Sequence, residues 1–304
     1  MTPPRVAFAT APDEHLGDND SDRRHHDAAC AAVGVALEHR VWSDPSVRWD
    51  RYDMVVVRST WDYLEHLDAF RAWIDRMGAL GTLHNPAAVI AWNLDKRYLV
   101  DLADAGVPVV PTTVCMTDGA VDRALAAAPG EVVVKPAVSA GSRHTGRFAA
   151  GDPAARRLAT TILDEGTPVM VQPSVASVAA VGETSTLVFD GQVSHTVRKG
   201  PLLSLGGGLT GGAYTERLTP EVLAPSQRAV VESAAATVHR LVADRFGVDE
   251  PLLYARFDIV TLDDGTEAVL EVELAEPTFF LEVDPDAAGR FAAVLARRLG
   301  RVPA

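Results

Sequence analysis

The segment YARFDIVTLDDGTEAVLEVELAEP, residues 254–277, limits what this chain can fold into more than any other. Two apolar runs flank Asp264-Gly265, a dipeptide favoured in tight β-hairpin turns with positive φ. A two-residue loop there places Asp258 directly opposite Glu271 on one face of the hairpin. Like charges opposite each other destabilise a sheet, and acidic residues are poor strand formers. Such a hairpin therefore needs something that makes its acidic face tolerable.

Glu273 joins the acidic pair on this face and lies opposite Arg256. A divalent cation can sit between the three carboxylates, because Mg²⁺ is commonly held by one or two carboxylates together with phosphate oxygens and water. Alternatively, these are surface groups, with Glu273 paired to Arg256 and the other two solvated. The metal site is favoured by apolar residues that leave little room for a wet surface, namely Phe257, Ile259, Val269 and Val272.

Size, charge and cysteine usage narrow the class of protein. A chain of 304 residues predicts two or three domains. Its net charge of −13 excludes a nucleic-acid partner, since phosphate-backbone binding needs concentrated Lys and Arg. Cys30 and Cys115 match no metal or redox spacing, which favours a reducing compartment. The first apolar run is too short for a signal peptide or a membrane span, so we expect a cytoplasmic protein without a membrane partner.

Strands and helices alternate over the first hundred residues. Residues 52–59, YDMVVVRS, form a continuously apolar run, which is typical of a parallel strand covered on both faces. The other elements expected here are strands at 5–10 and 37–42 and helices at 22–36, 63–77 and 93–106. This alternation predicts a parallel α/β domain over residues 1–108.

The pattern changes at about residue 109. Residues 109–175 contain four expected strands and two Ala-rich helices, which predicts an α+β domain of the size of a lid. Residues 176–304 contain a hairpin with an Asp190-Gly191 turn, a Gly-rich stretch at 204–213, a long helix at 220–246, the acidic hairpin and a short final helix. These elements predict a C-terminal domain with an antiparallel sheet. The Gly-rich stretch is expected either to close over a site or to be a plain connection.

A second chemical feature is EVVVKPAVSAGSRHTG, residues 131–146. Lys135 ends a strongly apolar strand, and the loop that follows is small and polar, with Ser139, Gly141 and Ser142 among its residues. Backbone N–H groups of such a loop can contact phosphate oxygens, and a strand-end lysine supplies compensating charge. No G-x-x-x-x-G-K-[ST] motif is present, so this is not a Walker A loop. The alternative is a lysine that only extends its head to solvent.

A third feature is VMVQPSV, residues 169–175, an apolar strand that breaks at Pro173. Its end, Gln172-Pro173-Ser174-Val175, could form a hinge whose backbone hydrogen-bonds a purine. Taken alone, this signal and the lysine loop are weak. Their order along the chain is far more specific than either.

That order resembles the ATP-grasp superfamily over about 200 residues, from NLDKRYL to LEVELAEP. The resemblance implies a parallel α/β N-terminal domain, a central lid and a C-terminal domain, with ATP between the last two. It implies that Lys96 and Lys135 contact the nucleotide phosphates and that the segment from Gln172 to Val175 contacts adenine. It also implies that Glu183 in VGETSTL holds the ribose.

The resemblance maps the metal-binding Asp and Glu of the superfamily onto Asp258 and Glu271. The usual Glu-x-Asn is Glu271-Val272-Glu273 here, so Glu273 keeps an oxygen ligand but adds a negative charge. The implied cofactors are ATP and two Mg²⁺ ions. The implied reaction phosphorylates a substrate carboxylate to an acyl phosphate, from which an amine displaces phosphate, while the protein positions groups and stabilises charge.

Arg198 lies at the end of the hairpin GETSTLVFDGQVSHTVRKGP. It resembles the superfamily arginine that steadies the transferring phosphoryl group, and together with Lys135 it is the expected catalytic residue. The alternative is a salt bridge with Glu183, which a two-residue Asp190-Gly191 turn would place opposite Arg198. His195 faces the other way, and both a structural hydrogen bond and a substrate contact are open for it.

The substrate is expected at the carboxyl ends of the N-terminal parallel strands, where ligands of such sheets bind. VVVRSTWDY places Arg58, Ser59 and Thr60 at one such end, followed by Asp62. Arg58 could bind a carboxylate and Asp62 an amino group, the two handles of an amino acid. The alternatives are a helix N-cap for Ser59 or Thr60 and a favourable first-turn charge for Asp62.

Within the superfamily, RSTWDY, WNLDKRYL and LEVELAEP resemble most the O-ureido-serine cyclo-ligase group, whose named member makes D-cycloserine. This implies ATP-dependent ring closure within one amino-acid-like small molecule, with loss of the ureido carbonyl as CO₂ and ammonia. The alternatives are an intermolecular ligase that joins an amino acid or short peptide to an amine, a catalytically idle nucleotide-binding module, and a calcium-binding domain. Substrate stereochemistry stays open, as does a homodimer.

Overall fold

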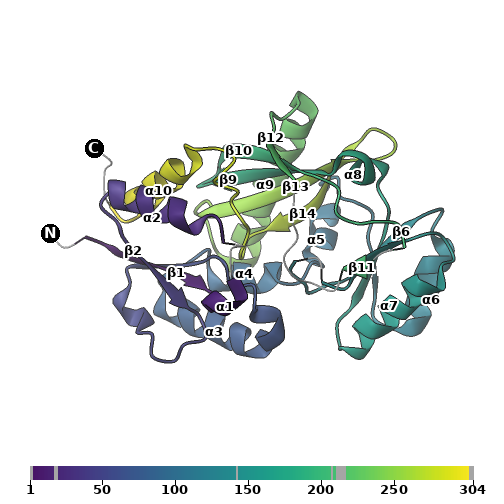
Figure 1. Ribbon diagram of the computed structural model, residues 1–304, viewed down its shortest axis with the longest axis horizontal. Helices are drawn as coiled ribbons and strands as arrows, with labels where there is room; N and C mark the ends of the chain where they lie inside the picture. Colours follow the sequence, from purple (N-terminus) through teal and green to yellow (C-terminus); the bar gives the residue numbers. More distant parts are fainter. Residues whose placement is uncertain (1–2, 17–19, 142, 207, 210–216, 301–304) are drawn as a thin grey trace.

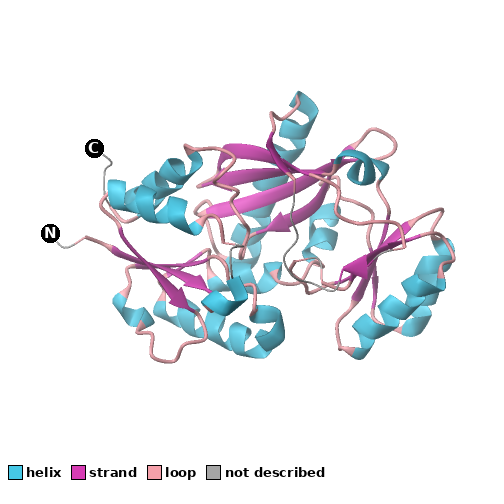
Figure 2. Ribbon diagram, viewed as in Figure 1, coloured by secondary structure: helices cyan, strands magenta, loops and turns pink. Residues whose placement is uncertain are grey.

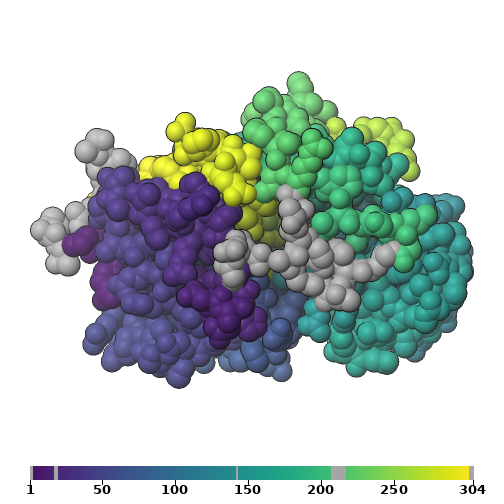
Figure 3. Space-filling view, in the orientation of Figure 1, coloured from purple at the N-terminus to yellow at the C-terminus, as the bar shows by residue number. Residues whose placement is uncertain are grey.

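The computed structural model describes residues 3–16, 20–141, 143–206, 208–209 and 217–300. Within these ranges the strands form three sheets, an N-terminal, a central and a C-terminal one, and the central sheet also takes in the short strand β11 from residues 176–304 (Figures 1 and 2). The N-terminal and central parts lie at opposite ends of the molecule, and C-terminal residues run along the side between them (Figure 3). The predicted boundaries at 108/109 and 175/176 remain predictions.

The N-terminal sheet is parallel and has the strand order β2-β1-β3-β4. Its strands are β1 (Arg5–Thr10), β2 (Ala36–Val41), β3 (Met54–Val57) and β4 (Leu83–His84). The helical elements around it are α1 (Asp13–Leu16), α2 (Arg23–Ala32), η1 (Trp49–Arg51), η2 (Tyr63–His66) and α3 (Leu67–Leu80). All four residues of β3 are buried, as its continuous apolar run predicts.

The two ends of the chain share one hydrophobic core. The last helix, α10 (Ala287–Arg298), packs against α2 (Figure 1). Phe8 of β1 belongs to the same buried cluster as Phe279 and Phe291 from the end of the chain. The N-terminal sheet is therefore completed by C-terminal residues, which fixes its position relative to the C-terminal sheet.

The central sheet is antiparallel, with the order β11-β7-β6-β8-β5. Its strands are β5 (Thr113–Cys115), β6 (Val132–Pro136), β7 (Thr145–Phe148), β8 (Val169–Pro173) and β11 (Gly208–Leu209). The two Ala-rich helices, α6 (Asp118–Ala127) and α7 (Pro153–Asp164), pack on it through an apolar cluster that includes Val121, Phe148 and Ile162. Each helix begins at a capping side chain, Thr117 for α6 and Asp152 for α7. The other face is left for a ligand.

The C-terminal sheet is antiparallel, with the order β12-β10-β9-β13-β14. Its strands are β9 (Glu183–Phe189), β10 (Gln192–Lys199), β12 (Leu218–Pro220), β13 (Tyr254–Thr261) and β14 (Glu267–Glu273). The nearby helices are α8 (Ala176–Val181) and the long α9 (Pro225–Phe246), which packs on β13 and β14. None of the helices in the described ranges combines the length and the apolar character that a membrane crossing requires.

The acidic hairpin has the predicted pairing but not the predicted loop. Leu262 N–H donates to the carbonyl of Thr266 over 2.8 Å, so three residues form the turn, and of these only Gly265 has positive φ. A β-bulge between the Asp258 and Ile259 pairings shifts the register back. The longer turn and the bulge each shift the strand pairing by one residue, in opposite directions. Asp258 therefore faces Glu271, as predicted.

In the hairpin of β9 and β10 the turn is as predicted, but the strand pairing is not. Asp190 and Gly191 form the expected two-residue turn, with φ of 51° and 76°. A bulge between Val193 and His195 then shifts the register by one residue. Lys199, not Arg198, is opposite Glu183, so the predicted Arg198–Glu183 pairing is wrong.

Side chains from residues 85–98 hydrogen-bond the edge strand β14 and the segment that follows it. Tyr98 Oη accepts from Val272 N–H over 2.8 Å, and the Asn93 amide bonds the carbonyl of Val272 and the N–H of Leu274 over 2.8 and 2.6 Å. Asn85 donates to the carbonyl of Leu274 over 2.9 Å and also bonds residues 253 and 254. These side chains bond backbone groups that a further strand would otherwise pair with, and they hold the acidic hairpin in place.

We predict that Asn85→Leu lowers the free energy of unfolding by about 2–4 kcal/mol, because it leaves three buried backbone groups without partners. Urea denaturation measures this loss. Gln192→Leu is the matched control, since the same side-chain change at an exposed strand position should shift the free energy by less than about 0.5 kcal/mol. Equal stability of the two variants would contradict the bridging role of Asn85.

Candidate active site

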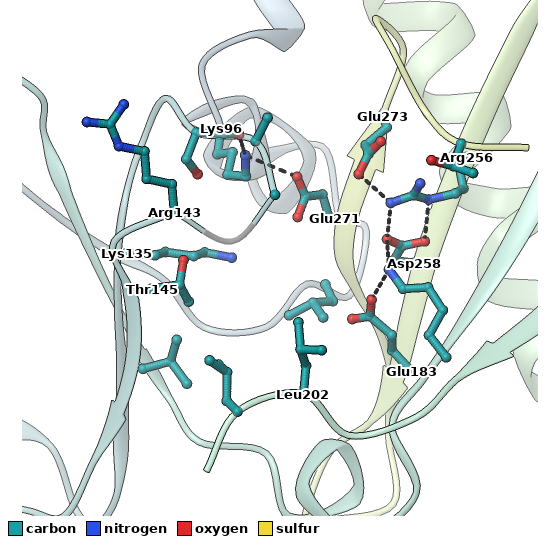
Figure 4. A pocket seen from close by; sticks show the side chains of 18 of the residues that line it. Lys96, Lys135, Arg143, Thr145, Glu183, Leu202, Arg256, Asp258, Glu271 and Glu273 are labelled. Atoms are coloured by element: carbon teal, nitrogen blue, oxygen red, sulfur yellow. Dashed lines mark hydrogen bonds and ion pairs between the residues drawn. The ribbon is translucent and has the colours of Figure 1, made fainter. Parts of the chain in front are cut away.

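A cavity of about 1110 Å³ has walls from all three parts of the chain. Residues 61–65 and 93–96 line it from the N-terminal part, β6 and β8 from the central sheet, and β9, β13 and β14 from the C-terminal sheet. Figure 4 shows Lys96 directed at Glu271 and Arg256 directed at Asp258 and Glu273, whereas Arg143 points away from them. A cavity of this size accommodates a nucleotide together with a small second ligand.

Most of the sequence-predicted site residues line this cavity. They are Asp62, Lys96, Lys135, Ser139, Gly141, Gln172, Pro173, Ser174, Val175, Glu183, Asp258, Glu271 and Glu273. Ser142 lies outside the described residues, as does much of the Gly-rich stretch at 204–213. Arg58, Ser59, His195 and Arg198 are not among the lining residues.

Lys96 lies in the turn between α4 (Ala87–Asn93) and α5 (Tyr98–Asp104), where the sequence predicted one continuous helix. Its backbone N–H donates to the carbonyl of Ala137 over 2.7 Å, which joins this turn to the end of β6. Its ammonium lies 2.5 Å from the carbonyl oxygen of Ser139 and 3.2 Å from Glu271 Oε1. Burial disfavours the charge, but Glu271 and Glu273 outweigh it and raise the pKa of Lys96.

Lys135 is in the opposite situation. Its side chain extends from β6 into the cavity and is only 7% exposed (Figure 4). Within the described part of the chain no hydrogen bond or ion pair of its ammonium is found. Burial, aided by the charge of Lys96, lowers the pKa of Lys135 despite the attraction of Glu271. A buried cation of this kind is stabilised by an anion that enters the cavity.

Two carboxylates of the acidic hairpin, Asp258 and Glu273, pair with cations of the same sheet, Arg256 on β13 and Lys199 on β10. Arg256 Nε and Nη2 each donate over 2.9 Å to the two oxygens of Asp258, and Nη2 also pairs with Glu273. Lys199 pairs with Glu183 and lies 3.3 Å from Asp258. Asp258 is 3% exposed, and these cations outweigh its burial and hold its pKa well below the usual range.

This network decides how the carboxylates can take a metal. The predicted alternative of a Glu273–Arg256 pair is present, yet the acids face a cavity and not bulk solvent. Glu271 and Glu273 keep 23% and 27% of their side chains exposed, so both can present oxygens to Mg²⁺. Asp258 has both oxygens occupied by cations. No described group of three acidic, His or Cys side chains is close enough to hold a metal alone.

The other end of the cavity is apolar. It is lined by Val110, Val133, Val175, Val178, Leu202 and Leu270. The predicted hinge at the end of β8 lies beside these residues, but some of its polar groups are already used. Gln172 Nε2 donates to Thr112 over 2.8 Å, and Ser174 N–H donates to the carbonyl of Glu131 over 2.8 Å. An apolar slot beside a strand end suits a flat, largely apolar ring such as adenine.

Arg58 has a structural position and not the predicted substrate-facing one. Its side chain is 5% exposed and lies 3.5 Å from the centroid of the Phe279 ring. Its guanidinium donates to the carbonyl of Pro277 over 2.7 Å and to Asp22 over 3.2 Å. Asp22 also accepts from the backbone of Phe279 and Leu281. Arg58 therefore joins the N-terminal part to residues 277–281.

The other predicted substrate residues divide into two groups. Ser59 hydrogen-bonds Asp20 away from the cavity, and the Nε2 atom of His195 lies 2.6 Å from the carbonyl oxygen of Phe279, which is the structural alternative for this histidine. Asp62 does line the cavity and accepts from Trp42 Nε1 over 2.8 Å. Burial raises the pKa of Asp62.

Arg198 pairs with Glu221, over 2.6 Å, and not with any cavity residue. Adjacent strand residues point to opposite faces, so the bulge in β10 gives the inward position to Lys199. Sequence reasoning missed Lys199 for this reason, and it treated Arg256 only as a partner of Glu273. The Arg-x-Asp spacing of Arg256 and Asp258 was the available signal, because residues two apart share a strand face.

Comparison with known proteins shows which family this chain belongs to. The cycloserine biosynthesis protein DcsG of Streptomyces lavendulae is 40% identical over 280 residues, which cover 89% of this chain and 91% of DcsG. Residues 6–85 match the model of the N-terminal domain of D-cycloserine synthetase DcsG. The chain belongs to the D-cycloserine synthetase family of ATP-grasp ligases. The expected resemblance to this group is thereby confirmed.

Solved structures agree with this family and with its fold. The crystal structure of D-cycloserine synthetase DcsG has a TM-score of 0.89 and 37% identity, and the match covers 97% of this chain and 99% of that one. D-alanine–D-alanine ligase from Bacillus anthracis has a TM-score of 0.67 at 13% identity, with 98% and 96% covered, and shows the shared fold. The predicted ATP-grasp fold and ATP-dependent ligase activity are confirmed. Solved structures with this fold include ATP-grasp ligase PsnB with Mg and ADP and D-alanine–D-alanine ligase from Bacillus anthracis with ATP.

The two lysines should respond oppositely to loss of their charge. We predict that Lys135→Met raises the stability of the ligand-free protein by about 1 kcal/mol, because it removes a buried ammonium without a partner. Lys96→Met should lower it, because Glu271 loses its cation. Thermal unfolding with and without ADP and Mg²⁺ measures both effects, and both variants should lose most of the ADP-dependent increase in Tm. Shifts of the same sign in the ligand-free variants would refute this electrostatic difference.

Proposed function

We propose that this protein closes a ring within an O-ureido-serine-like amino acid, using ATP to activate the carboxylate and giving a cycloserine-type product. The observation that carries the proposal is the convergence of Lys96, Lys135, Lys199 and Arg256 on one cavity together with Glu271 and Glu273. Family membership supports the reaction class. The substrate is a small molecule, and a homodimer stays a prediction.

ATP fits the cavity in one orientation. The adenine ring belongs in the apolar slot beside Val175, with Glu183 near the ribose. The phosphates then extend toward Lys135, whose ammonium lacks an anionic partner among the described residues, and toward Lys96. Ser139 and Gly141 lie in the loop after β6, where backbone N–H groups can contact phosphate oxygens.

Mg²⁺ would be held by Glu271 and Glu273, the two carboxylates with exposed oxygens. When bound, it neutralises charge on the phosphate oxygens. Two ions are proposed from the number of carboxylates, and Asp258 becomes a ligand only if Arg256 or Lys199 turns from it toward the phosphates. Arg256 pairs with the glutamate that replaces the usual asparagine, but burial still raises the pKa of Glu273 to about 8, so its negative charge is only partly compensated in the ligand-free protein.

The chemistry needs positive charge where the phosphoryl group moves. An oxygen of the substrate carboxylate attacks the terminal phosphorus as the bond to ADP breaks. The nitrogen bonded to the side-chain oxygen then attacks the acyl carbon, the acyl C–O bond breaks, phosphate leaves with its electron pair, and the nitrogen loses a proton. Water then adds to the ureido carbonyl, the bond between that carbon and the ring nitrogen breaks, the ring nitrogen takes up a proton, and the carbamic acid released decomposes to CO₂ and ammonia. Lys199 and Arg256 can bind the oxyanions of both steps, because each already faces oxyanions in the cavity.

The decisive test is release of ADP and the mass of the product. One enantiomer of O-ureido-serine should stimulate ADP release at least ~10-fold over the background, with D- and L-serine as controls. A product that lacks water and the carbamoyl part supports the proposal. Loss of water alone would indicate simple ring closure, and a summed mass with an added amine would indicate intermolecular ligation. Absence of any substrate-stimulated ADP would indicate an idle nucleotide-binding module.

Glu271→Gln supplies the metal control for this assay. The variant should lose turnover because it removes the charge of a proposed Mg²⁺ ligand and leaves Lys96 without its partner. Near-normal turnover, with an unchanged dependence on Mg²⁺ concentration, would remove Glu271 from the metal site.

Lys199 and Arg198 form a matched pair for the proposed phosphoryl contact. We predict that Lys199→Met lowers kcat/KM at least ~100-fold, because it removes an inward cation that faces the site of phosphoryl transfer. Arg198→Met should change kcat/KM by less than ~3-fold, because its guanidinium pairs with Glu221 outside the cavity. The reverse order of effects would restore the catalytic role expected for Arg198 from the sequence.

A further inference from the structure

The carboxylate of Glu276 lines the cavity but has no role in the proposed reaction. It follows β14 and lies on the side of the cavity that the N-terminal part forms. Its neighbours among the lining residues include Trp61, Tyr63 and Thr278. Neither the metal ligands nor the phosphate-binding lysines account for it.

The N-terminal part holds Glu276 at two points. Trp61 Nε1 donates to its backbone carbonyl over 3.2 Å. Tyr63 lines the cavity together with Glu276, and its hydroxyl partly offsets the rise in the pKa of the Glu276 carboxyl. Tyr63 is itself 1% exposed, and its ring stacks on Phe70 with centroids 5.0 Å apart. The carboxylate therefore has a defined position although its chain segment is a loop.

Glu276 differs from the other inner carboxylates in its ion pairs. Lys96 pairs with Glu271, and Arg256 pairs with Asp258 and Glu273. Among the described residues no ion pair to Glu276 is found. Burial raises the pKa of Glu276 to about 7, and only in part do Lys96 and the Tyr63 hydroxyl offset this. The protein thus positions a carboxylate in its active-site wall and provides no cation of its own to pair with it.

The position of Glu276 suits the α-ammonium group of an amino acid. Glu276, Lys96 and Arg256 line the same cavity, and the charges of these two cations act on Glu276. An amino acid carries its ammonium one tetrahedral carbon away from its carboxylate. When the carboxylate lies among the cations that stabilise phosphoryl transfer, the ammonium must lie immediately beside them. Glu276 places a carboxylate in the wall of the cavity that these cations also line.

We propose that Glu276 binds the α-ammonium group of the amino-acid substrate and that Tyr63 is the residue that positions its carboxylate. The inference rests on the proposed function, since it assumes that an amino acid is activated in this cavity. It assigns selection for a free ammonium to a residue outside the predicted substrate set. Arg58, Ser59 and His195 do not line the cavity, and this assignment explains how an amino acid is selected without them.

Asp62 is the competing acceptor, and its surroundings make it the weaker one. It is 4% exposed, and one of its oxygens is bonded to Trp42. His15 and His66, on the N-terminal part, are among the groups whose charges act on it. An ammonium at Asp62 would leave the substrate carboxylate away from the cations of the phosphoryl site.

The experiment compares binding of two ligands to the full-length protein in the presence of Mg²⁺ and a non-hydrolysable ATP analogue. One is the O-ureido-serine enantiomer that binds more tightly, and the other is its des-amino analogue, 3-(ureidooxy)propanoate. Calorimetry should show that the wild type prefers the amino compound at least ~30-fold. Glu276→Gln should reduce this preference to less than ~3-fold, with the affinity for the des-amino compound nearly unchanged.

Three further variants test the assignment of the ammonium to one residue. Asp62→Asn should retain the preference, and Glu282→Gln, at an exposed carboxylate on the cavity rim, should retain both the preference and the affinity. Tyr63→Phe should lower the preference by an intermediate factor without changing Tm enough to account for it. Loss of preference in Asp62→Asn but not in Glu276→Gln would overturn the proposal.

Other outcomes separate this inference from the proposed function. Equal binding of both ligands to the wild type, or binding of neither, overturns the ammonium subsite whatever the turnover assay shows. A change in Mg²⁺ dependence of Glu276→Gln with the ligand preference intact also overturns it, because Glu276 would then serve a metal. Selective binding that depends on Glu276, with no ADP release in the turnover assay, supports the subsite and refutes only the ring-closing reaction.

Discussion

The structure depends on balancing negative charge that is buried on the last hairpin. Asp258, Glu271 and Glu273 lie on one face of β13 and β14, where their mutual repulsion would oppose folding. Arg256, Lys199 and Lys96 reach them from β13, from β10 and from the turn before α5. Lys96 comes from the N-terminal part and the other two cations from the C-terminal sheet, so neutralising the acids also joins these two walls of the cavity. Lys96 in turn bonds the carbonyls of Ala137 and Ser139 in the central part.

Because the charges of the ligand-free site are paired with one another, a bound ligand can replace these ion pairs with its own. The cations that neutralise the carboxylates are the groups that phosphate oxygens attract, and the carboxylates they release are the ligands that Mg²⁺ prefers. Binding of a metal–nucleotide complex can therefore replace ion pairs within the protein by ion pairs with the ligand, at little cost in unpaired charge. Lys135 and Glu276 are the exceptions, because neither has an ionic partner among the described residues, and each needs a ligand group of opposite charge.

Much of the cavity wall could be predicted from the sequence, because local signals mark it. Lys96 and Lys135 follow recognisable patterns, and the acidic hairpin has an obvious turn. The errors arose where one residue of register matters. A bulge in β10 exchanged the directions of Arg198 and Lys199, whereas in the acidic hairpin a longer turn and a bulge cancelled. Bulges leave no clear sequence signal, since they depend on how a whole strand packs.

Arg58 shows a different limit of sequence reasoning. It does follow a parallel strand, as predicted, but Asp22 and the ring of Phe279 enclose it in the interior. The sequence by itself determined the type and order of the elements, the fold and the chemical class of the site, because periodicity and motif order are local properties of the chain. Only the tertiary structure decided which side chains face the cavity and which cations pair with the acids, because those contacts join residues far apart in sequence and change with a single bulge.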